Sequence, residues 1–296
     1  MTVSVIVVSY NTIDFLRTCL ASLAEAAEVI VVDNASHDGS PEMVEREFPS
    51  VKLVRNGQNL GFGAANNRGM DVAIGDLVLL LNSDAYARPG AIRTLASVFE
   101  DSTVVAAGGR LLNPDGSLQN STARRLTLWA VFCEQFYLER LFRSYWTTAS
   151  LPPDRPSETE QVMGACLMLR PVEEFDERFF LYCEDTELCH RLRAHGKILY
   201  VPGAEFVHEL GASSSARRWE SVARYNRGKE LYFSIHHGRA ARFACFLLNR
   251  LGAVLRLIVW TLATLLTLGC VRRVRAKVSL FFRVLFAPVV ENPQAS

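Results

Sequence analysis

A single carboxylate stands at the end of a long apolar run. The run covers Leu77–Leu81 and is followed by Asn82, Ser83 and Asp84. An apolar run bounded by polar turn residues predicts a strand that is buried on both faces of a parallel sheet. Because ligands bind at the carboxyl ends of such strands, Asp84 could hold a divalent cation against a phosphate. Alternatively, Asp84 opens a turn or caps the helix expected after Pro89.

Two adjacent acids, Glu184 and Asp185, follow an aromatic segment and stand at the start of a helix expected over Asp185–His195. The helix dipole favours acids at this position, so ordinary helix capping would explain them. An acid beside an apolar wall can also act as a general base. His208 follows a short strand-like run, where it is either a satisfied polar residue or a metal ligand together with Asp84.

Short polar side chains follow the first two strand-like runs. Ser9 and Asn11 follow the first run, and Asp33 and Asn34 follow the second. At the edge of a parallel sheet these groups could hydrogen-bond the base and the ribose of a nucleotide. Asn, Asp and Ser also favour turns for local reasons, so the pattern by itself leaves both interpretations open.

Two glycines, Gly61 and Gly63, stand at the start of a helix expected near Phe62–Ala73, which also contains Asn66. Free backbone amides at a helix start favour phosphate. The segment lacks the third glycine of a dinucleotide-binding fingerprint and does not follow the first strand. This pattern therefore argues against an NAD-dependent oxidoreductase.

The segments around these residues alternate between strand-like and helical patterns. Strands are predicted over Val3–Val8, Val29–Val32, Val51–Val54, Leu77–Leu81 and Val104–Ala107. Helices are predicted over Asp14–Ala24, Pro41–Phe48, Phe62–Ala73 and Pro89–Phe99. This alternation predicts βαβ units in an α/β fold with a mostly parallel sheet.

The pattern is irregular over residues 113–156, which we interpret as an aromatic-rich insertion or lid. Regular patterns return over Val162–Leu169, in the helix that follows the acid pair, and in short strands at Ile198–Val201 and Phe206–His208. These later elements would bring Glu184, Asp185 and His208 to the same fold as the earlier strands.

Charge is distributed unevenly along the 296 residues, although the net charge is only +1. No Asp or Glu occurs from Leu231 to Val290, where nine Arg or Lys occur, whereas residues 1–230 carry 23 basic and 30 acidic residues. Basic residues alternate there with long apolar runs, which argues against nucleic-acid binding. The two parts of the chain therefore face different surroundings.

The acid-free tail combines apolar residues with basic ones. Its longest uncharged run, Leu257–Val271, has 15 residues, or about 22 Å as a helix, whereas a bilayer core is about 30 Å thick. We therefore expect an amphipathic helix that lies in the interface and is attracted to anionic lipid, unless Arg256 snorkels and lets the segment span. A helical subunit interface is the alternative.

The cysteine pattern bears on the compartment. The seven cysteines are odd in number and show no C-x-x-C spacing, which argues against a disulfide framework and fits a reducing compartment. The chain begins directly with a strand-like run, so a signal peptide is not expected.

The combination of motifs resembles a known family. S-V-I-V-V-S-Y-N, V-V-D-N-A-S-H-D-G-S, N-L-G-F-G-A-A-N-N-R-G and L-L-L-N-S-D-A look like the nucleotide-sugar half of inverting family 2 glycosyltransferases of the GT-A fold. G-A-C-L-M-L-R, F-D-E-R-F-F-L-Y-C-E-D-T-E-L-C-H-R and V-H-E-L-G look like their acceptor half. Within that family the pattern is most similar to bacterial rhamnosyltransferases that act on lipid-linked sugars. The resemblance covers residues 3 to about 237.

The resemblance implies a fold and a domain organisation. It predicts a Rossmann-like mixed, mostly parallel sheet flanked by helices over residues 1–237. Residues 1 to about 110 would form the nucleotide-sugar half, and residues from about 111 to 237 the acceptor half. Residues 238–290 would form a basic amphipathic helical tail that associates with a membrane.

The resemblance also implies roles for individual residues. The family's D-x-D metal motif falls on Asn82-Ser83-Asp84, where Asn replaces the first acid, so Asp84 becomes the main carboxylate ligand and metal affinity could be low without the sugar diphosphate. His208 matches a position that completes the metal shell, and Asp185 matches the catalytic base. Glu184 would support the site or bind acceptor hydroxyls. Residues expected near the nucleotide sugar are Ser9, Asn11, Asp33, Asn34, Gly61, Asn66, Asn82 and Asp84.

The implied reaction is a metal-dependent, inverting sugar transfer. The expected cofactor is Mg²⁺ or Mn²⁺, the expected donor dTDP-L-rhamnose, and the expected acceptor a saccharide on polyprenyl diphosphate, whose diphosphate Arg227 and Lys229 could contact. The enzyme would work peripherally at the cytoplasmic face of a bacterial inner membrane, in cell-envelope polysaccharide synthesis. UDP-galactofuranose, UDP-glucose and UDP-N-acetylhexosamine remain open as donors, and so does a catalytically silent sugar-nucleotide-binding protein.

Overall fold

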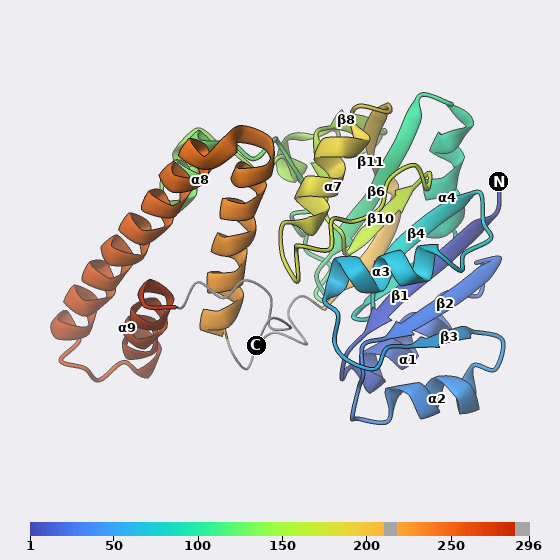
Figure 1. Ribbon diagram of the computed structural model, residues 1–296, viewed down its shortest axis with the longest axis horizontal. Coiled ribbons are helices and arrows are strands. Elements are labelled where there is room, and N and C mark those ends of the chain that lie inside the picture. The colour runs from blue at the N-terminus through green and yellow to red at the C-terminus, as the bar shows by residue number, and fades with distance from the viewer. Residues whose placement is uncertain (210–217, 288–296) are drawn as a thin grey trace. The chain divides into compact units, whose positions relative to one another are not determined.

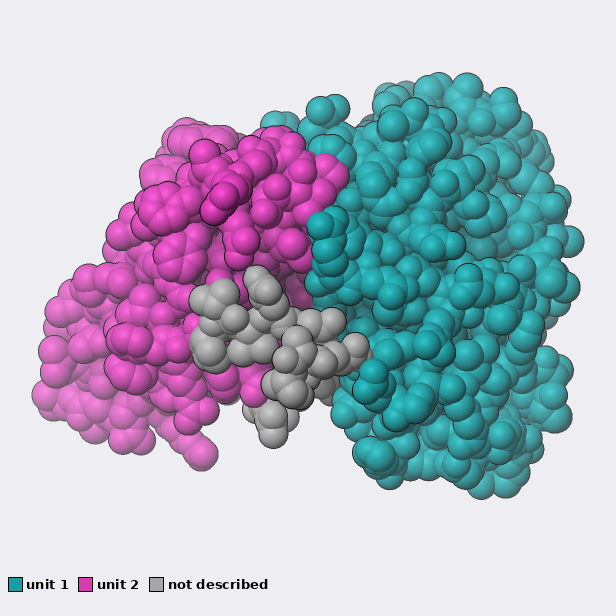
Figure 2. All heavy atoms as spheres, in the orientation of Figure 1, with its two compact units in different colours: residues 1–125, 146–180, 184–213 teal, residues 126–145, 181–183, 214–296 magenta. Residues whose placement is uncertain are grey.

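The computed structural model describes residues 1–209 and 218–287. These residues form two compact units (Figure 2). Unit 1 comprises residues 1–125, 146–180 and 184–213, and unit 2 comprises residues 126–145, 181–183 and 214–296. The domain boundaries expected from the sequence, at residues 110 and 237, stay predictions.

Unit 1 is built on a mixed sheet flanked by helices (Figure 1). Its strands are paired in the order β3-β2-β1-β4-β10-β6-β11-β5, and β8 pairs with β11. The strands of this sheet are β1 (Val3–Ser9), β2 (Glu28–Asp33), β3 (Lys52–Arg55), β4 (Leu77–Asn82), β5 (Ala85–Ala87), β6 (Val104–Leu112), β8 (Ser157–Thr159), β10 (Cys166–Leu169) and β11 (Lys197–His208). A separate two-stranded sheet pairs β7 (Thr122–Ala123) with β9 (Gln161–Val162).

The N-terminal half of the sheet is parallel, as the alternation of strands and helices predicts. β1 pairs in parallel with both β2 and β4, and β2 pairs in parallel with β3. β10 runs antiparallel between β4 and β6, and β6 pairs in parallel with β11. Parallel strands need long crossovers, which α1 (Ile13–Ala21), α2 (Ser40–Glu47) and α3 (Phe62–Met70) supply.

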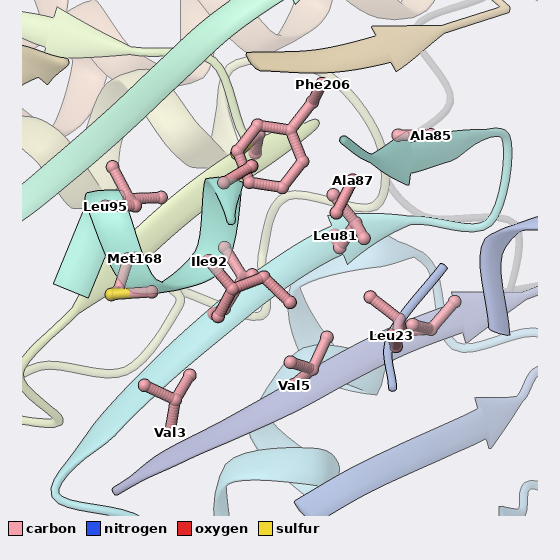
Figure 3. Close-up of a cluster of buried hydrophobic side chains, with 14 of the residues drawn as sticks. Val3, Val5, Leu23, Leu81, Ala85, Ala87, Ile92, Leu95, Met168 and Phe206 are labelled. Atoms are coloured by element: carbon pink, nitrogen blue, oxygen red, sulfur yellow. The ribbon is translucent and has the colours of Figure 1, made fainter. Parts of the chain in front are cut away.

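Two hydrophobic clusters cover the two faces of this sheet. Because side chains alternate along a strand, Val5 and Leu79 point to one face while Ile6 and Leu80 point to the other. The first face packs against α1, α2 and α4 (Ala91–Ser97), and Figure 3 shows Ile92 and Leu95 of α4 in this cluster. The second packs against α3 and α7 (Glu184–Leu192). Burial on both faces explains the continuous apolar run of β4.

Two predicted segments differ from the elements observed. The regular pattern over Val162–Leu169 corresponds to two strands, β9 and β10, and between them the backbone N–H of Gly164 donates to Asp185 instead of to a neighbouring strand. The expected strands at Ile198–Val201 and Phe206–His208 are one strand, β11, whose register against β6 shifts between Val201 and Glu205. The irregular segment contains α5 (Leu128–Gln135) and α6 (Glu139–Phe142).

Unit 2 is helical. Besides α5 and α6 it contains α8 (Arg218–Leu266) and α9 (Arg272–Leu285), which pack against each other. Gly238 has φ 83° and ψ 178°, so α8 is divided there into two arms (Figure 1). α8 is long and apolar enough to cross a membrane by length and composition alone. The predicted helical tail is therefore confirmed, with a break at Gly238.

Candidate active site

Sheet pairing brings Asp84 and His208 together. β11 pairs with β5 so that His208 lies opposite Ala85, the residue after Asp84. Asp84 Oδ1 lies 3.3 Å from His208 Nε2, and Asn82 Nδ2 lies 3.3 Å from the same nitrogen. Asp84 and His208 are both buried. The ends of β4 and β11 thus gather the three residues that the sequence assigned to the metal and diphosphate.

Gln119 fixes the orientation of the imidazole of His208. Its amide nitrogen donates to Asn113 Oδ1 over 2.8 Å and to the carbonyl oxygen of His208 over 3.2 Å. The other amide atom, Oε1, lies 2.7 Å from His208 Nδ1 and can only accept. With these hydrogen bonds assigned, Nδ1 carries the hydrogen, and the lone pair of Nε2 in the neutral ring faces Asp84 and Asn82.

This arrangement fits a divalent cation. An imidazole lone pair and a carboxylate oxygen repel each other unless a proton or a cation lies between them. A ligating histidine usually donates its other N–H to an oxygen acceptor, as His208 does to Gln119. Within residues 1–209 and 218–287, no group of three or more His, Cys, Asp or Glu could hold a metal. Asp84 and His208 would therefore need further ligands from a bound diphosphate.

The acid pair opens α7 close to the end of β4. Asp185 Oδ2 accepts a hydrogen bond of 2.9 Å from the backbone N–H of Gly164, and the carbonyl of the next residue, Ala165, accepts one of 3.1 Å from the N–H of Asn82. A Cβ on Gly164 would lie 3.3 Å from the Cβ of Asp185 and 3.2 Å from the ring of Phe62. The absence of a side chain at Gly164 lets the acid approach this closely.

The two acids differ in their surroundings. Burial raises the pKa of Glu184 to about 8, and the charge of Asp185 adds to this shift. Burial also raises the pKa of Asp185, but hydrogen bonds from the backbone of Gly164 and Thr186 oppose the rise. Burial therefore favours the neutral form of Glu184, whereas the hydrogen bonds from Gly164 and Thr186 favour the charged form of Asp185, which is the form a general base requires.

A hydrogen-bonded loop joins the nucleotide half to the acid pair. Asn34 Nδ2 donates to the carbonyl of Gly61 over 3.0 Å, and Asn34 Oδ1 accepts from Asn56 over 2.8 Å. Phe62 N–H then donates to the carbonyl of Phe180 over 2.9 Å. A Cβ on Gly61 would lie 2.2 Å from that carbonyl oxygen. Asn34 thus fixes the loop at Gly61, and this loop in turn is hydrogen-bonded to Phe180, four residues before Glu184.

The ends of β1 and β2 bring the remaining polar residues to this edge of the sheet. Ser9 lies in register with Asp33, and Ser9 Oγ lies 3.2 Å from Thr12 Oγ1. Asn11 Oδ1 accepts a hydrogen bond of 2.8 Å from the backbone N–H of His37. Asp33 Oδ2 accepts one of 3.0 Å from the N–H of Ser36. The turns after both strands are therefore organised by the residues predicted to lie near the nucleotide.

Several buried oxygen atoms at this edge have no hydrogen-bond partner within the described part of the chain. They are Asp33 Oδ1, Asn66 Oδ1 and Glu184 Oε2. A buried polar atom without a partner costs free energy, and three of them near one sheet edge are typical of a site that a polar ligand completes.

Arg227 and Lys229, the predicted contacts of the acceptor diphosphate, lie in unit 2. The side chain of Lys229 is 0% exposed, and its Nζ lies 2.9 Å from Glu134 Oε2. Arg227 Nη1 lies 2.8 Å from Glu230 Oε2. Their role at a diphosphate stays a prediction, and the burial of Lys229 favours a structural role for that residue.

Sequence reasoning missed Gln119 and Gly164. Gln119 lies in the irregular segment, where its only signal is a short polar cluster, Gln119–Thr122. Gly164 lies within the regular pattern over Val162–Leu169, which gives no sign of its bond to Asp185. Both act through hydrogen bonds to residues distant in sequence, which no local pattern reveals.

The chain matches the family model of glycosyl transferase family 2 over residues 4–155. It is also 30% identical, over 79% of its length and 84% of the relative's, to N-acetylglucosaminyl-diphospho-decaprenol L-rhamnosyltransferase of Mycobacterium tuberculosis. The chain belongs to glycosyl transferase family 2. A low-salt glycan biosynthesis hexosyltransferase of Haloferax volcanii is 24% identical over 64% of the chain and 61% of that relative.

Solved structures confirm the GT-A fold of this glycosyltransferase. A mannosyltransferase from Pyrobaculum calidifontis, solved with GDP-Man and Mn²⁺, matches with a TM-score of 0.56 at 17% identity, covering 96% of this chain and 84% of that one. GalNAc-T7, solved with UDP, GalNAc and Mn²⁺, matches with a TM-score of 0.56 at 17% identity, covering 79% of this chain and 50% of that one. Both neighbours bind Mn²⁺ with a nucleotide or nucleotide sugar.

Proposed function

We propose that this glycosyltransferase moves L-rhamnose from dTDP-L-rhamnose onto a saccharide linked to polyprenyl diphosphate, with inversion at the anomeric carbon. The observation that carries the proposal is the 30% identity, over 79% of the chain, to the mycobacterial rhamnosyltransferase, whose name specifies a lipid-diphosphate-linked acceptor. The product would serve cell-envelope polysaccharide synthesis.

Asp185 is the proposed general base. It would take the proton from an acceptor hydroxyl as that oxygen attacks the anomeric carbon opposite the leaving group. Its hydrogen bonds to Gly164 and Thr186 support this role because they hold the carboxylate in place and stabilise its charge. Glu184, in the neutral form that burial favours, could donate a hydrogen bond from its partnerless oxygen to an acceptor hydroxyl.

The donor would lie along the ends of β1, β2 and β4. Ser9, Asn11 and Asp33 would lie near the base and ribose, and Asn66 near the sugar. Asn34 and Gly61 would contribute by shaping the loop that faces the donor, since their polar groups already bond to each other. Asn82 and Asp84 would face the diphosphate.

A divalent cation, Mg²⁺ or Mn²⁺, would be held by Asp84 and His208, and when bound it neutralises charge on the departing nucleoside diphosphate. Asn82 would contribute an uncharged amide. Affinity for the cation would therefore depend on the phosphates of the donor.

The acceptor lipid places the proposed reaction at a membrane. A polyprenyl chain resides in the bilayer while a sugar nucleotide is soluble, so we expect the enzyme to work as a peripheral protein on the cytoplasmic face. The apolar helix α8 and the excess of basic residues in the tail support attachment to an anionic membrane surface.

A donor screen tests the proposal. Full-length protein receives Mg²⁺ or Mn²⁺, a bacterial lipid extract as acceptor, and one of four donors: dTDP-rhamnose, UDP-galactofuranose, UDP-glucose or UDP-N-acetylglucosamine. We expect label to enter lipid from dTDP-rhamnose and the Asp185→Asn variant to be inactive. Transfer from another donor would contradict the sugar, and nucleotide binding without transfer from any donor would favour a silent binding protein.

A further inference from the structure

Two arginines interrupt the apolar sequence of the tail, but both point into unit 2. Arg250 donates to the carbonyl oxygens of Val284, Leu285 and Ala287, at the end of α9. Arg256 donates to the carbonyl of Glu134, and to the backbone and side-chain oxygens of Gln135, each over 2.7 Å. Neither charge therefore needs a partner outside the protein.

The outward face of the second arm of α8 is consequently free of charge from Phe243 to Leu266. Its exposed large side chains recur every three or four residues, which places them along one side of the helix. They are Phe243, Leu247, Leu251, Val254, Ile258, Val259, Leu262, Leu265 and Leu266, of which Val259 and Leu266 directly follow another member. We call this set the outer stripe. The helical segment that carries the outer stripe, residues 243–266, has 24 residues and is about 36 Å long. The opposite side of this segment is buried at Cys245, Asn249, Gly252 and Ala253.

Exposed aromatic and basic residues lie in and near α5 and α6, and α5 packs alongside α8, which carries the outer stripe. Tyr137 is half exposed and contacts Arg256, near the middle of the stripe. Trp129 and Phe142 are also exposed, with their rings 5.4 Å apart. Arg140 and Arg143 are exposed in and directly after α6. Tyr, Trp and Arg together are typical of surfaces at the headgroup level of a bilayer.

The position of Tyr137, in contact with Arg256 midway along the second arm of α8, distinguishes two ways in which this helix would meet a membrane. If α8 crossed the bilayer, the middle of the stripe would lie at the centre of the hydrocarbon, and Arg140 and Arg143 would be placed near it at high cost. If α8 lies parallel to the surface, the stripe enters the hydrocarbon while Tyr137 and these arginines stay among the headgroups.

We propose that unit 2 docks on an anionic bilayer with α8 parallel to the membrane plane, the outer stripe inserted among the acyl chains and the bordering arginines on headgroup phosphates. Arg239 before the stripe, and Arg272, Arg273 and Arg275 after it, are exposed and extend the basic border to both ends. This assigns a membrane-binding face and its orientation to the proposed glycosyltransferase. Only the choice of a lipid surface as the partner rests on the proposed function.

Flotation with vesicles tests the face. Full-length protein is mixed with phosphatidylcholine vesicles, with or without phosphatidylglycerol. The wild type is compared with a Leu251→Glu/Ile258→Glu double variant. The control is Ile74→Glu, because Ile74 in unit 1 is 83% exposed. We expect the double variant to lose at least about tenfold in membrane partitioning, and the control to match wild type. Equal flotation of both variants would overturn the assigned face.

A thiol label tests the orientation. Within the described residues six cysteines are buried and Cys270, after α8, is exposed, so it can be labelled selectively. On vesicle-bound protein we expect Cys270 to stay reactive to an impermeant maleimide added outside, and a fluorophore there to be quenched by shallow lipid spin labels. Protection from the maleimide, with quenching again by shallow spin labels, would overturn the parallel orientation in favour of a span, because Cys270 after the end of α8 would then lie at the far interface.

Two further measurements separate this inference from the proposed function and from a subunit interface. Transfer to a water-soluble acceptor analogue should be unchanged in the double variant, so a failure of catalysis and a failure of docking give different results. Light scattering without lipid should give the same mass for wild type and variant. A wild-type dimer that the substitutions dissociate, with unchanged flotation, would assign the stripe to a second copy of the chain instead.

Discussion

At the scale of single residues, the candidate site depends on polar groups that act in pairs. In the proposed site Asp84 and His208, 3.3 Å apart, would share one position for a cation, and Glu184 and Asp185 would divide the tasks of a neutral and a charged acid. In each pair, one residue influences the protonation or charge state of the other, and the proposed role depends on that state. Substitutions at the partner should therefore change measurable properties of the first residue.

Asp185→Asn removes the proposed base and keeps the shape of the side chain. We expect turnover to fall by about 10²- to 10⁴-fold, while affinity for the nucleotide stays within about threefold of wild type. Steady-state kinetics and calorimetric titration with the nucleoside diphosphate measure the two effects. Turnover that persists near the wild-type rate would assign the proton transfer to another group.

Glu184→Gln tests the raised pKa through stability. The folded pKa of about 8 exceeds the ordinary value of 4.5, so the folded state holds a proton that the unfolded state releases. The resulting stabilisation is complete below about pH 4.5 and is lost as the pH rises to about 8, by at most about 1.4 kcal/mol per pH unit. Denaturant unfolding from pH 5 to 8 should show this loss in wild type and a flatter profile in the variant. Equal slopes would contradict the shift.

Gln119 is a positioning residue for His208. Gln119→Leu removes the acceptor for Nδ1, and we expect about 10- to 100-fold weaker binding of Mn²⁺ in the presence of nucleoside diphosphate. Gln119→Glu keeps an acceptor and should retain more of this affinity. Electron paramagnetic resonance of free Mn²⁺ measures binding without turnover, so a general loss of activity cannot imitate the effect. Equal Mn²⁺ affinity in wild type and Gln119→Leu would contradict the proposal that Gln119 positions His208.

At the scale of elements, the loop before α3 places one backbone against another. Gly61 has φ +87°, and a Cβ there would meet the carbonyl of Phe180 at 2.2 Å. We expect Gly61→Ala to destabilise the fold by about 2 kcal/mol or more, from backbone strain and the clash together. Gly57→Ala in the same loop meets nothing within 4 Å and is the matched control. Thermal unfolding should separate the two, and similar melting temperatures would show that the loop relaxes.

The sequence predicted the parallel half of the sheet because both faces of its strands are buried, which produces continuous apolar runs such as that of β4. It also placed Asp84, Asp185 and His208 at the ends of regular elements, and the structure has Asp84 just after β4, Asp185 in the first turn of α7 and His208 at the end of β11, while their roles stay predictions. It did not predict the division at Gly164 or the single long β11, because both depend on pairing with distant segments. Gln119 was missed for the same reason: its role arises from three hydrogen bonds outside any periodic pattern.

At the scale of the whole molecule, the tail shows that charge along a sequence and charge on a surface are different properties. Arg250 and Arg256 shorten the uncharged run to 15 residues in the sequence, yet both side chains bond to oxygen atoms within unit 2. Because both arginine side chains point into unit 2, the exposed apolar face continues past them. Hydropathy along the sequence therefore underestimates the length of this face.

Arg256→Leu lengthens the apolar run and would look harmless from the sequence. The structure predicts the reverse, because the oxygen atoms of Glu134 and Gln135 would lose their donor. We expect unit 2 to be destabilised by about 2–4 kcal/mol, measured by thermal unfolding in mild detergent. Arg272→Leu, at an exposed position, is the control and should be close to neutral. Equal stability of the two variants would show that the internal bonds of Arg256 contribute little.

The shift in β11 has a consequence for which insertions the chain can accept. Three residues of β11 lie between the pairs Val201–Gly109 and Glu205–Arg110, so the strand is already out of step with β6 at that point. An added residue there would enlarge an existing bulge and leave the downstream pairing intact. An added residue between Glu205 and His208 would turn the imidazole to the opposite face of the sheet. Homologous chains should therefore vary in length on one side of Glu205 and keep a constant length on the other.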